Sequence, residues 1–199
     1  MHPDAEAAAK SQVSGSGGYA REHLDVLVLH GSPGSGKSTL SGAKADLLRE
    51  SGLANAVIDL DELTMVYPHP ERSFALNNLR AIWPNYATIA GLRLVIPSAI
   101  ADEDERVQLR AAVRGSRFVV CELTAPETVL KERVAAREPN EYWRSRLRNF
   151  VDLYQQRSDL ARIRDFQVST HARSVAEAAR EVIEQVGWQL QPEAERLHT

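Results

Sequence analysis

The sequence predicts an α/β fold, a three-layer sandwich in which helices cover both faces of a five-stranded parallel sheet. From residue 25 onward, short continuous apolar runs alternate with longer stretches of helical pattern. This order is typical of parallel strands joined by right-handed helical crossovers. A glycine-rich loop separates the first apolar run from the first helical stretch. Because ligands in such folds bind beyond the carboxyl ends of the strands, we expect the functional residues to follow directly after the strands.

The expected strands are short and mostly apolar, as buried parallel strands are. They cover residues 26–29, 56–58, 92–96, 118–123 and 166–168. Helical patterns cover 38–50, 74–90 and 141–164, and Pro84 should kink or interrupt the second of these. Thr124 with Glu127, and Ser174 with Glu177, each match a capping box that opens a helix, the first running to about Arg137.

Composition limits the class of protein. The chain has 199 residues, a hydrophobic fraction of 43% and a net charge of −3, which suit one globular domain and argue against a general nucleic-acid binder. Residues 1–22 are rich in Ala, Gly and Ser and are expected to form a flexible tail, followed by one domain over 23–199. With no long apolar stretch and a single cysteine, Cys121, we expect a buried thiol, no membrane partner and a cytoplasmic location.

The loop after the first strand carries the most specific motif. It matches G-x-x-x-x-G-K-[ST] and consists of Gly31, Ser32, Pro33, Gly34, Ser35, Gly36, Lys37, Ser38 and Thr39. Glycines let successive backbone N–H groups point inward as an anion nest, and the next helix directs its positive end there. Lys37 would hold the β- and γ-phosphates with its ammonium facing an empty anion site, and the Ser38 hydroxyl would ligate Mg²⁺. The motif therefore predicts a nucleoside triphosphate site.

Two carboxylates follow the second strand. Asp59 and Asp61 are two residues apart, so both can point the same way in an extended chain. One acid near Mg²⁺ and one near an acceptor hydroxyl is what phosphoryl transfer to an alcohol needs. The alternative is that Asp61 only caps a helix while Asp59 is a solvated strand end.

With these motifs, the chain resembles the P-loop kinases of the shikimate, gluconate and adenylylsulfate kinase group, and is similar to chloramphenicol phosphotransferases and zeta-type toxins. The resemblance spans residues 25–188. It implies a P-loop NTPase fold with strand order 2-3-1-4-5, ATP and Mg²⁺ as cofactors, and a hydroxyl-bearing small molecule as acceptor. It also implies that Asp59 helps to hold Mg²⁺ and that Asp61 contacts or deprotonates the acceptor.

The same resemblance implies a lid at about 138–148 and an acceptor-binding segment at about 63–90. Arg133 and Arg137 share one helix face and are expected to touch the nucleotide, Arg137 as a catalytic group. Further arginines of the lid region are Arg144, Arg146 and Arg148. The acceptor segment contains Tyr67, His69, Arg72, Asn77, Asn78, Arg80, Trp83 and Tyr86, although packing of an ordinary helix would explain most of them.

One feature departs from many P-loop NTPases, because the third strand ends Val95-Ile96-Pro97-Ser98 without an acid for Mg²⁺. Ser98 and Arg106 fall in a region that contacts substrate in the adenylylsulfate kinases. A second function remains open, a regulatory or energy-coupling NTPase that acts through a protein partner. The guanine motif of GTPases is absent, and a motor or AAA-type ATPase should be larger and carry the missing acid. A homodimer is also possible.

Overall fold

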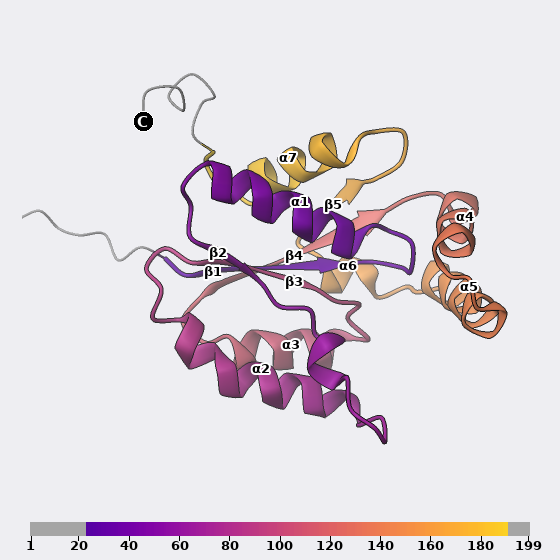
Figure 1. The fold of residues 1–199 in the computed structure, drawn as a ribbon, viewed down its shortest axis with the longest axis horizontal. Helices are drawn as coiled ribbons and strands as arrows, with labels where there is room; N and C mark the ends of the chain where they lie inside the picture. The colour runs from indigo at the N-terminus through magenta and orange to yellow at the C-terminus, as the bar shows by residue number, and fades with distance from the viewer. Residues whose placement is uncertain (1–22, 191–199) are drawn as a thin grey trace, which may run out of the picture.

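The computed structural model describes residues 23–190, so the expected tail at 1–22 lies outside the described residues. Its five strands are β1 (Asp25–His30), β2 (Asn55–Val57), β3 (Arg93–Pro97), β4 (Arg117–Thr124) and β5 (Phe166–Ser169). All pairings are parallel, and the order across the sheet is β2-β3-β1-β4-β5 (Figure 1). This order confirms the predicted P-loop fold.

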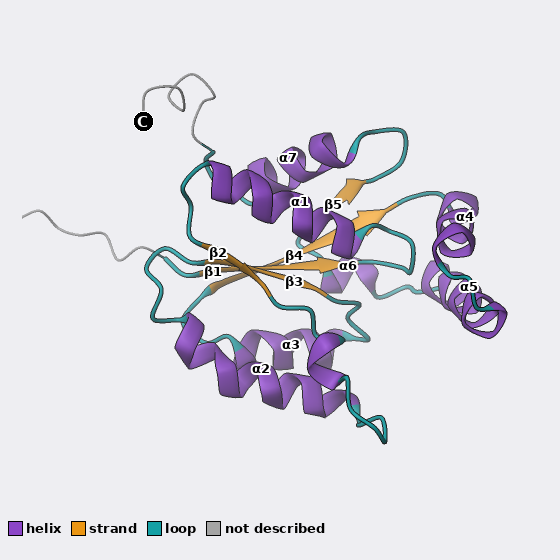
Figure 2. Cartoon of the chain, in the orientation of Figure 1, coloured by secondary structure: helices purple, strands orange, loops and turns teal. Residues whose placement is uncertain are grey.

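Helices cover both faces of the sheet, as Figure 2 shows. On one face lie α1 (Lys37–Glu50) and α7 (Val175–Gln185), and on the other lie α2 (Arg72–Tyr86) and α3 (Glu103–Ala112). A short 3₁₀ turn, η1 (Glu62–Thr64), precedes α2, and α6 (Leu160–Ile163) precedes β5. The pair α4 (Glu127–Arg137) and α5 (Glu141–Gln155) stands apart, beyond the carboxyl end of the sheet. In the described part of the chain, no helix is long and apolar enough to cross a membrane.

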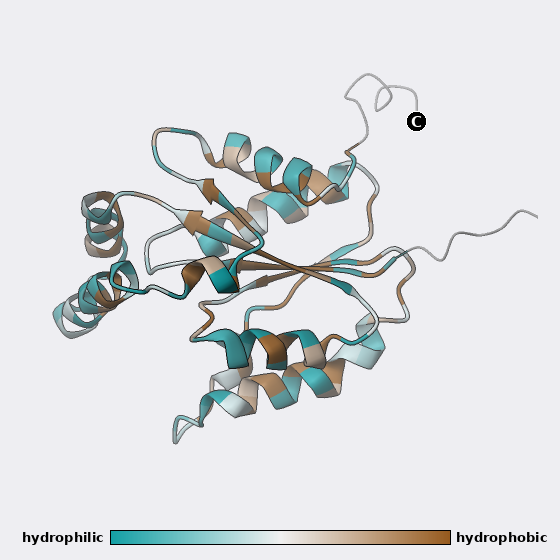
Figure 3. Cartoon of the chain, turned by 180° about the vertical axis from the view of Figure 1, so that it is seen from behind, coloured by the Kyte–Doolittle hydropathy of each residue, from teal (hydrophilic) through white to brown (hydrophobic). Residues whose placement is uncertain are grey.

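The core is divided by the sheet, because side chains alternate along a strand. Val26 and Val28 of β1 pack toward α2 and α3, whereas Leu27 and Leu29 pack toward α1 and α7. All four are buried, so β1 reads as a continuous apolar run. The central strands are accordingly the most uniformly hydrophobic part of the fold (Figure 3).

Two predicted boundaries are wrong. Thr124 does not cap α4, because it is still paired with Ser169 in the sheet, and Glu127 accepts a hydrogen bond from Lys131 instead. The helix expected over 141–164 ends at Gln155, where Arg157 turns away to donate to the Ile100 carbonyl at 2.7 Å.

Other local expectations hold. Ser174 forms the predicted capping box of α7, with both reciprocal hydrogen bonds present. Pro84 lies inside the last turn of α2 and the helix ends two residues later, at Tyr86 rather than at 90. Cys121 is buried, and this burial raises its thiol pKa to about 12, which suits an inert thiol.

Candidate phosphoryl-transfer site

The P-loop connects β1 to α1 and needs its glycines. Gly34 has φ +80°, and a Cβ there would lie 2.6 Å from the Leu130 carbonyl oxygen of α4. Gly31 has φ +147°, and a Cβ there would lie 2.6 Å from the Leu123 carbonyl oxygen. Gly36 is left-handed at φ +96°, although a Cβ there would meet only the Leu40 side chain. The loop thus adopts conformations that L side chains rarely reach, and α4 packs directly on it.

The sequence predicts that the Lys37 ammonium faces an empty anion site, but in the structure it is bonded to the P-loop backbone. Its ammonium donates to the carbonyl oxygens of Gly31 at 2.7 Å and Ser32 at 3.0 Å, so it bridges the loop in this state. Burial, followed by the nearby Arg137 guanidinium, lowers the pKa of Lys37 to about 8, against the opposing effect of Asp61. A phosphate group in the loop would supply the full negative charge that these neutral carbonyls do not.

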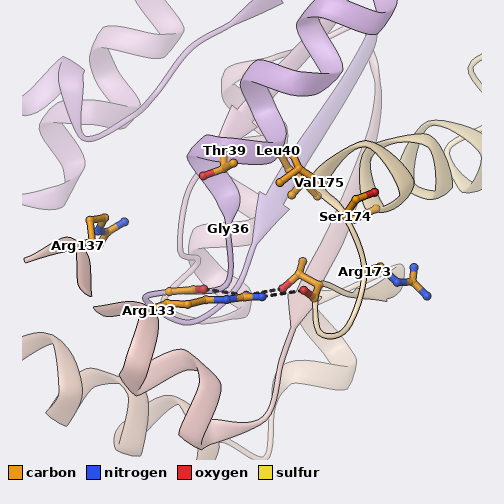
Figure 4. Close-up of a pocket in the computed structure, with 11 residues that line it drawn as sticks. Gly36, Thr39, Leu40, Arg133, Arg137, Arg173, Ser174 and Val175 are labelled. Atoms are coloured by element: carbon orange, nitrogen blue, oxygen red, sulfur yellow. Dashed lines mark hydrogen bonds between the residues drawn. The ribbon is translucent and has the colours of Figure 1, made fainter. Parts of the chain in front are cut away.

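A cavity of about 270 Å³ lies between the P-loop, α4 and the start of α7 (Figure 4). Arg133 forms one wall and donates to Thr170 Oγ1 at 2.9 Å, to the Thr170 carbonyl at 2.8 Å and to the Gly34 carbonyl at 3.3 Å. Leu40 and Val175 supply apolar surface. A planar guanidinium fixed by three hydrogen bonds offers a stacking surface for a nucleotide base.

A second cavity, of about 230 Å³, lies over the P-loop itself. Lys37, Ser38 and Thr39 line one side, and Asp61 and Arg72 line the other. Arg137 borders both this cavity and the first one, whereas Arg133 borders only the first. The predicted pair of arginines is therefore brought to the site, with Arg137 on the phosphate side.

The two carboxylates after β2 have different surroundings. The Asp59 carboxylate accepts the Asp61 backbone N–H at 3.0 Å, and burial raises its pKa. Asp61 occupies the cap position of η1, but its side chain makes no capping hydrogen bond and is 86% exposed. Its carboxylate lies 3.5 Å from Arg72 Nη1. Asp61 is thus an exposed carboxylate at the cavity edge, paired with Arg72, and its side chain does not cap a helix.

Arg72 is held more firmly than its place in the sequence suggested. It donates to Glu105 Oε1 at 2.5 Å, to Ser98 Oγ at 2.7 Å and to the Ala99 carbonyl at 2.9 Å. Glu105 is buried, and its other oxygen accepts the Ala101 backbone N–H at 2.5 Å. Arg72 was named only as one polar residue of the acceptor segment, because its partners come from the β3–α3 region, 26 to 33 residues away.

A third and larger cavity, about 850 Å³ and open to solvent, adjoins the second one. Asp61 and Arg72 line both. The remaining wall comes from the loop before α2 and from two aromatic side chains of α5. Of the eight residues named in the acceptor segment, Tyr67, His69 and Arg72 line this cavity, together with Thr64, Met65, Val66 and Pro70 of the same segment.

The residues proposed for Mg²⁺ are chemically suitable. Ser38 lies at the exposed mouth of the P-loop, and Asp59 follows β2 with a carboxylate whose second oxygen has no hydrogen bond within the described residues. Oxygen ligands of this kind, completed by phosphate and water, are what Mg²⁺ prefers. Among the described residues there is no cluster of three or more acidic, His or Cys side chains that could hold a metal ion.

The later arginines differ in role. Arg144 donates to the Glu138 and Pro139 carbonyls and pairs with Glu141, so it fastens the corner between α4 and α5. Arg146 stacks on aromatic rings of α5, and Arg148 is exposed. Arg106 donates to the Ile163 carbonyl and Asp165, where it joins α3 to the segment before β5.

A buried polar chain, unnoticed in the sequence, joins the P-loop strand to α5. His30 Nδ1 accepts the Ile100 N–H at 2.9 Å, so the neutral ring carries its proton on Nε2 and donates to the Tyr154 hydroxyl, 2.9 Å away. Tyr154 donates to Glu122 Oε1 at 2.9 Å, and Arg164 pairs with the other Glu122 oxygen. Burial lowers the His30 pKa to about 3, which keeps it neutral. His30, at the end of β1, is thus linked to α5 by hydrogen bonds.

Several solved structures share this fold. The Mycobacterium tuberculosis APS kinase CysC, in complex with AMPPNP and APS, has a TM-score of 0.61 at 21% identity over 82% of this chain and 98% of that one. A Deinococcus radiodurans tunicamycin resistance protein has 0.61 at 16% identity over 85% and 99%. A Sinorhizobium meliloti gluconokinase has 0.55 at 23% identity over 82% and 91%. At such identities the likeness concerns the fold alone.

No curated protein sequence matches the chain significantly. A sequence profile described as AAA domain (AAA_33) matches residues 26–157, from β1 through the P-loop, both acids and the α4–α5 pair. The profile matches although β3 ends without the acid expected of a motor or AAA-type ATPase. The chain belongs to the AAA domain family AAA_33, with the P-loop fold that small-molecule kinases share.

Proposed function

We propose that the protein is an ATP-dependent kinase that transfers the γ-phosphoryl group to a hydroxyl of a small molecule. The observation that carries the proposal is that Asp61 and Arg72 line both the cavity over the P-loop and the larger open cavity beside it. A carboxylate at such a junction can face a phosphoryl donor on one side and an acceptor hydroxyl on the other. A regulatory NTPase has no need of a second, ligand-sized cavity at this point.

The nucleotide would lie across two of the cavities. Its base would occupy the cavity of Arg133, Leu40 and Val175, and its phosphates would lie over the P-loop with Lys37 and Arg137 around them. Mg²⁺, held by Ser38 and Asp59 together with phosphate oxygens, would neutralise charge that develops on the phosphates. Lys37 would exchange its two carbonyl partners for phosphate oxygens, which favours its charged form.

Asp61 would orient and deprotonate the acceptor hydroxyl. Its exposed ion pair with Arg72, at 3.5 Å, is weak, so the carboxylate stays available as a base. Arg72 itself is fixed by Glu105 and Ser98 and can keep Asp61 directed toward the junction. An alcohol is a poor nucleophile at pH 7, and a positioned general base contributes about 10²–10⁴-fold.

The solved structures that share this fold support a kinase as the class of enzyme. The structures with the same fold include an APS kinase, a shikimate kinase in complex with shikimate, and a gluconokinase. We carry over from them only the class of reaction, ATP-dependent phosphorylation of a hydroxyl, because their identity to this chain is low.

The test is ADP release measured with and without a panel of hydroxyl-bearing metabolites, with the phosphorylated product identified by ³¹P NMR. We expect slow hydrolysis alone, acceleration by one class of acceptor, and no turnover in Lys37→Ala. ATP hydrolysis that no small molecule accelerates, but that a purified protein partner does, would contradict the kinase and favour a regulatory NTPase.

A further inference from the structure

The large open cavity has a composition that points to a class of acceptor. We propose, resting on the function proposed above, that the acceptor is an uncharged molecule with a ring or other large apolar part close to its reacting hydroxyl. The apolar part would lie between the loop that precedes α2 and the aromatic face of α5, with the hydroxyl at Asp61.

The walls of the cavity are mainly apolar. Six of its ten lining residues have large apolar or aromatic side chains or a proline ring, namely Met65, Val66, Tyr67, Pro70, Trp143 and Phe150. Its volume of about 850 Å³ falls in the range of about 300–1,000 Å³ that suits a drug-sized ligand. A compact, fully polar acceptor would leave most of this surface in contact with water.

These apolar side chains are exposed to an unusual degree. Tyr67 is 96% exposed, Met65 83% and Trp143 50%, and all three line the same cavity. Apolar groups gathered in this way around one cavity mark a binding surface, whereas single exposed apolar residues need no explanation. A ligand with an apolar body would remove both sides of the opening from water at once.

An arginine holds the aromatic face of α5 in place. Trp143 and Phe150 are seven residues apart and so share one side of the helix. The Arg146 guanidinium lies between them, 5.8 Å from the Trp143 ring and 5.7 Å from the Phe150 ring. Two rings held by one cation lose less side-chain freedom when a ligand packs on them.

The charges of the cavity disfavour an acidic acceptor. Arg72 is the only Lys or Arg among the described residues that line it, and three of its hydrogen bonds go to Glu105, Ser98 and Ala99. The buried Glu105 carboxylate already balances its charge. Asp61 also lines the cavity and would repel a carboxylate or sulfate held beside the reacting hydroxyl, whereas the Arg146 guanidinium is engaged by the Trp143 and Phe150 rings.

The first experiment measures binding apart from catalysis. The uncharged fluorophore N-phenyl-1-naphthylamine is titrated into the full chain, and energy transfer from tryptophan is recorded. Trp143 lines the cavity, whereas the buried Trp83 and Trp188 do not, and the variants below locate the probe. We expect saturable binding that Phe150→Ala weakens at least about tenfold. The control is Leu153→Ala, which removes an exposed apolar side chain of α5 that does not line the cavity.

Equal binding by wild type, Phe150→Ala and Leu153→Ala would overturn the inference, because the probe would then lie elsewhere. A concentration-dependent dimer in light scattering that Trp143→Ala abolishes, with no probe binding, would also overturn it and assign the surface to a second copy of the chain.

The second experiment separates this inference from the proposed function. ADP release is measured with two sets of alcohols, uncharged ring-bearing alcohols and hydroxy acids of six or fewer carbons. Acceleration by the first set only, with a KM that rises in Phe150→Ala more than kcat falls, is expected. Acceleration by the hydroxy acids only would overturn the inference and leave the kinase intact. Probe binding at Phe150 without turnover of any alcohol would instead contradict the kinase and keep the apolar site.

Discussion

A single buried lysine should give the stability of this protein a distinctive pH dependence. Lys44 of α1 is fully buried, its amine has no hydrogen-bond partner among the described residues, and it lies 5.5 Å from the centre of the Trp188 ring. Burial lowers its pKa from 10.5 to about 7, and the nearby Cys121 opposes this only in part. The unfolded chain therefore binds a proton that the folded chain lacks between about pH 7 and pH 10.

The sign and size of this pH dependence follow from the linkage between proton binding and folding. Where the unfolded state binds more protons, stability rises with pH, so the cost of Lys44 is greatest below pH 7 and fades toward its unfolded pKa. At about 1.4 kcal/mol per pKa unit, the lowered pKa corresponds to a maximal cost of about 5 kcal/mol. Of this, about 2 kcal/mol should be recovered between pH 7 and pH 9.

The assay compares wild type with Lys44→Met by urea unfolding at pH 7, 8 and 9, followed by circular dichroism. Methionine nearly keeps the shape without the charge. Between pH 7 and pH 9, the free energy of unfolding of wild type should rise by about 2 kcal/mol relative to that of the variant. Both proteins contain Cys121, whose raised pKa acts in the opposite direction only above about pH 9, at the end of this range. Parallel pH profiles would refute a neutral, buried Lys44.

Three further predictions concern the site and its supports. Lys37→Ala should abolish phosphoryl transfer with little change in melting temperature, and retained turnover would mean that its phosphate role is wrong. Gly34→Ala should impair nucleotide binding, measured with a fluorescent ATP analogue, because its Cβ would meet the Leu130 carbonyl oxygen at 2.6 Å. Tyr154→Phe should lower the free energy of unfolding by about 1–3 kcal/mol, because the buried Glu122 carboxylate loses a hydrogen-bond donor. An unchanged free energy of unfolding would show that the hydrogen bonds from His30 to Glu122 do not stabilise the fold.

The sheet and the P-loop could be predicted because their signals are local. Continuous apolar runs mark buried parallel strands, and the G-x-x-x-x-G-K-[ST] motif places its loop after the first of them. The capping box at Ser174 could also be read correctly, because Ser174 and Glu177 need only each other. The same pattern failed at Thr124, whose backbone is engaged by β5, a strand more than 40 residues later.

Parts of the site depend on contacts between distant segments. Arg72 becomes a fixed element only through Glu105 and Ser98, and the chain from His30 to Glu122 exists only when β1, β4 and α5 meet. No spacing in the sequence signals such contacts. The helix that carries Trp143 and Phe150 was predicted, but the cavity that these two residues line depends on how α4 and α5 are placed relative to the loop before α2.

The central claim is that Asp61 activates an acceptor hydroxyl at the junction of two cavities. Its most direct test is the steady-state kinetics of Asp61→Asn with ATP and the best acceptor from the screen, beside Asp59→Asn. We predict that Asp61→Asn lowers kcat at least about 10²-fold with little change in ATP affinity, because the lost interaction belongs to the transition state. Asp59→Asn should instead weaken the dependence on Mg²⁺. Normal turnover in Asp61→Asn, with only a shifted melting temperature, would contradict the account.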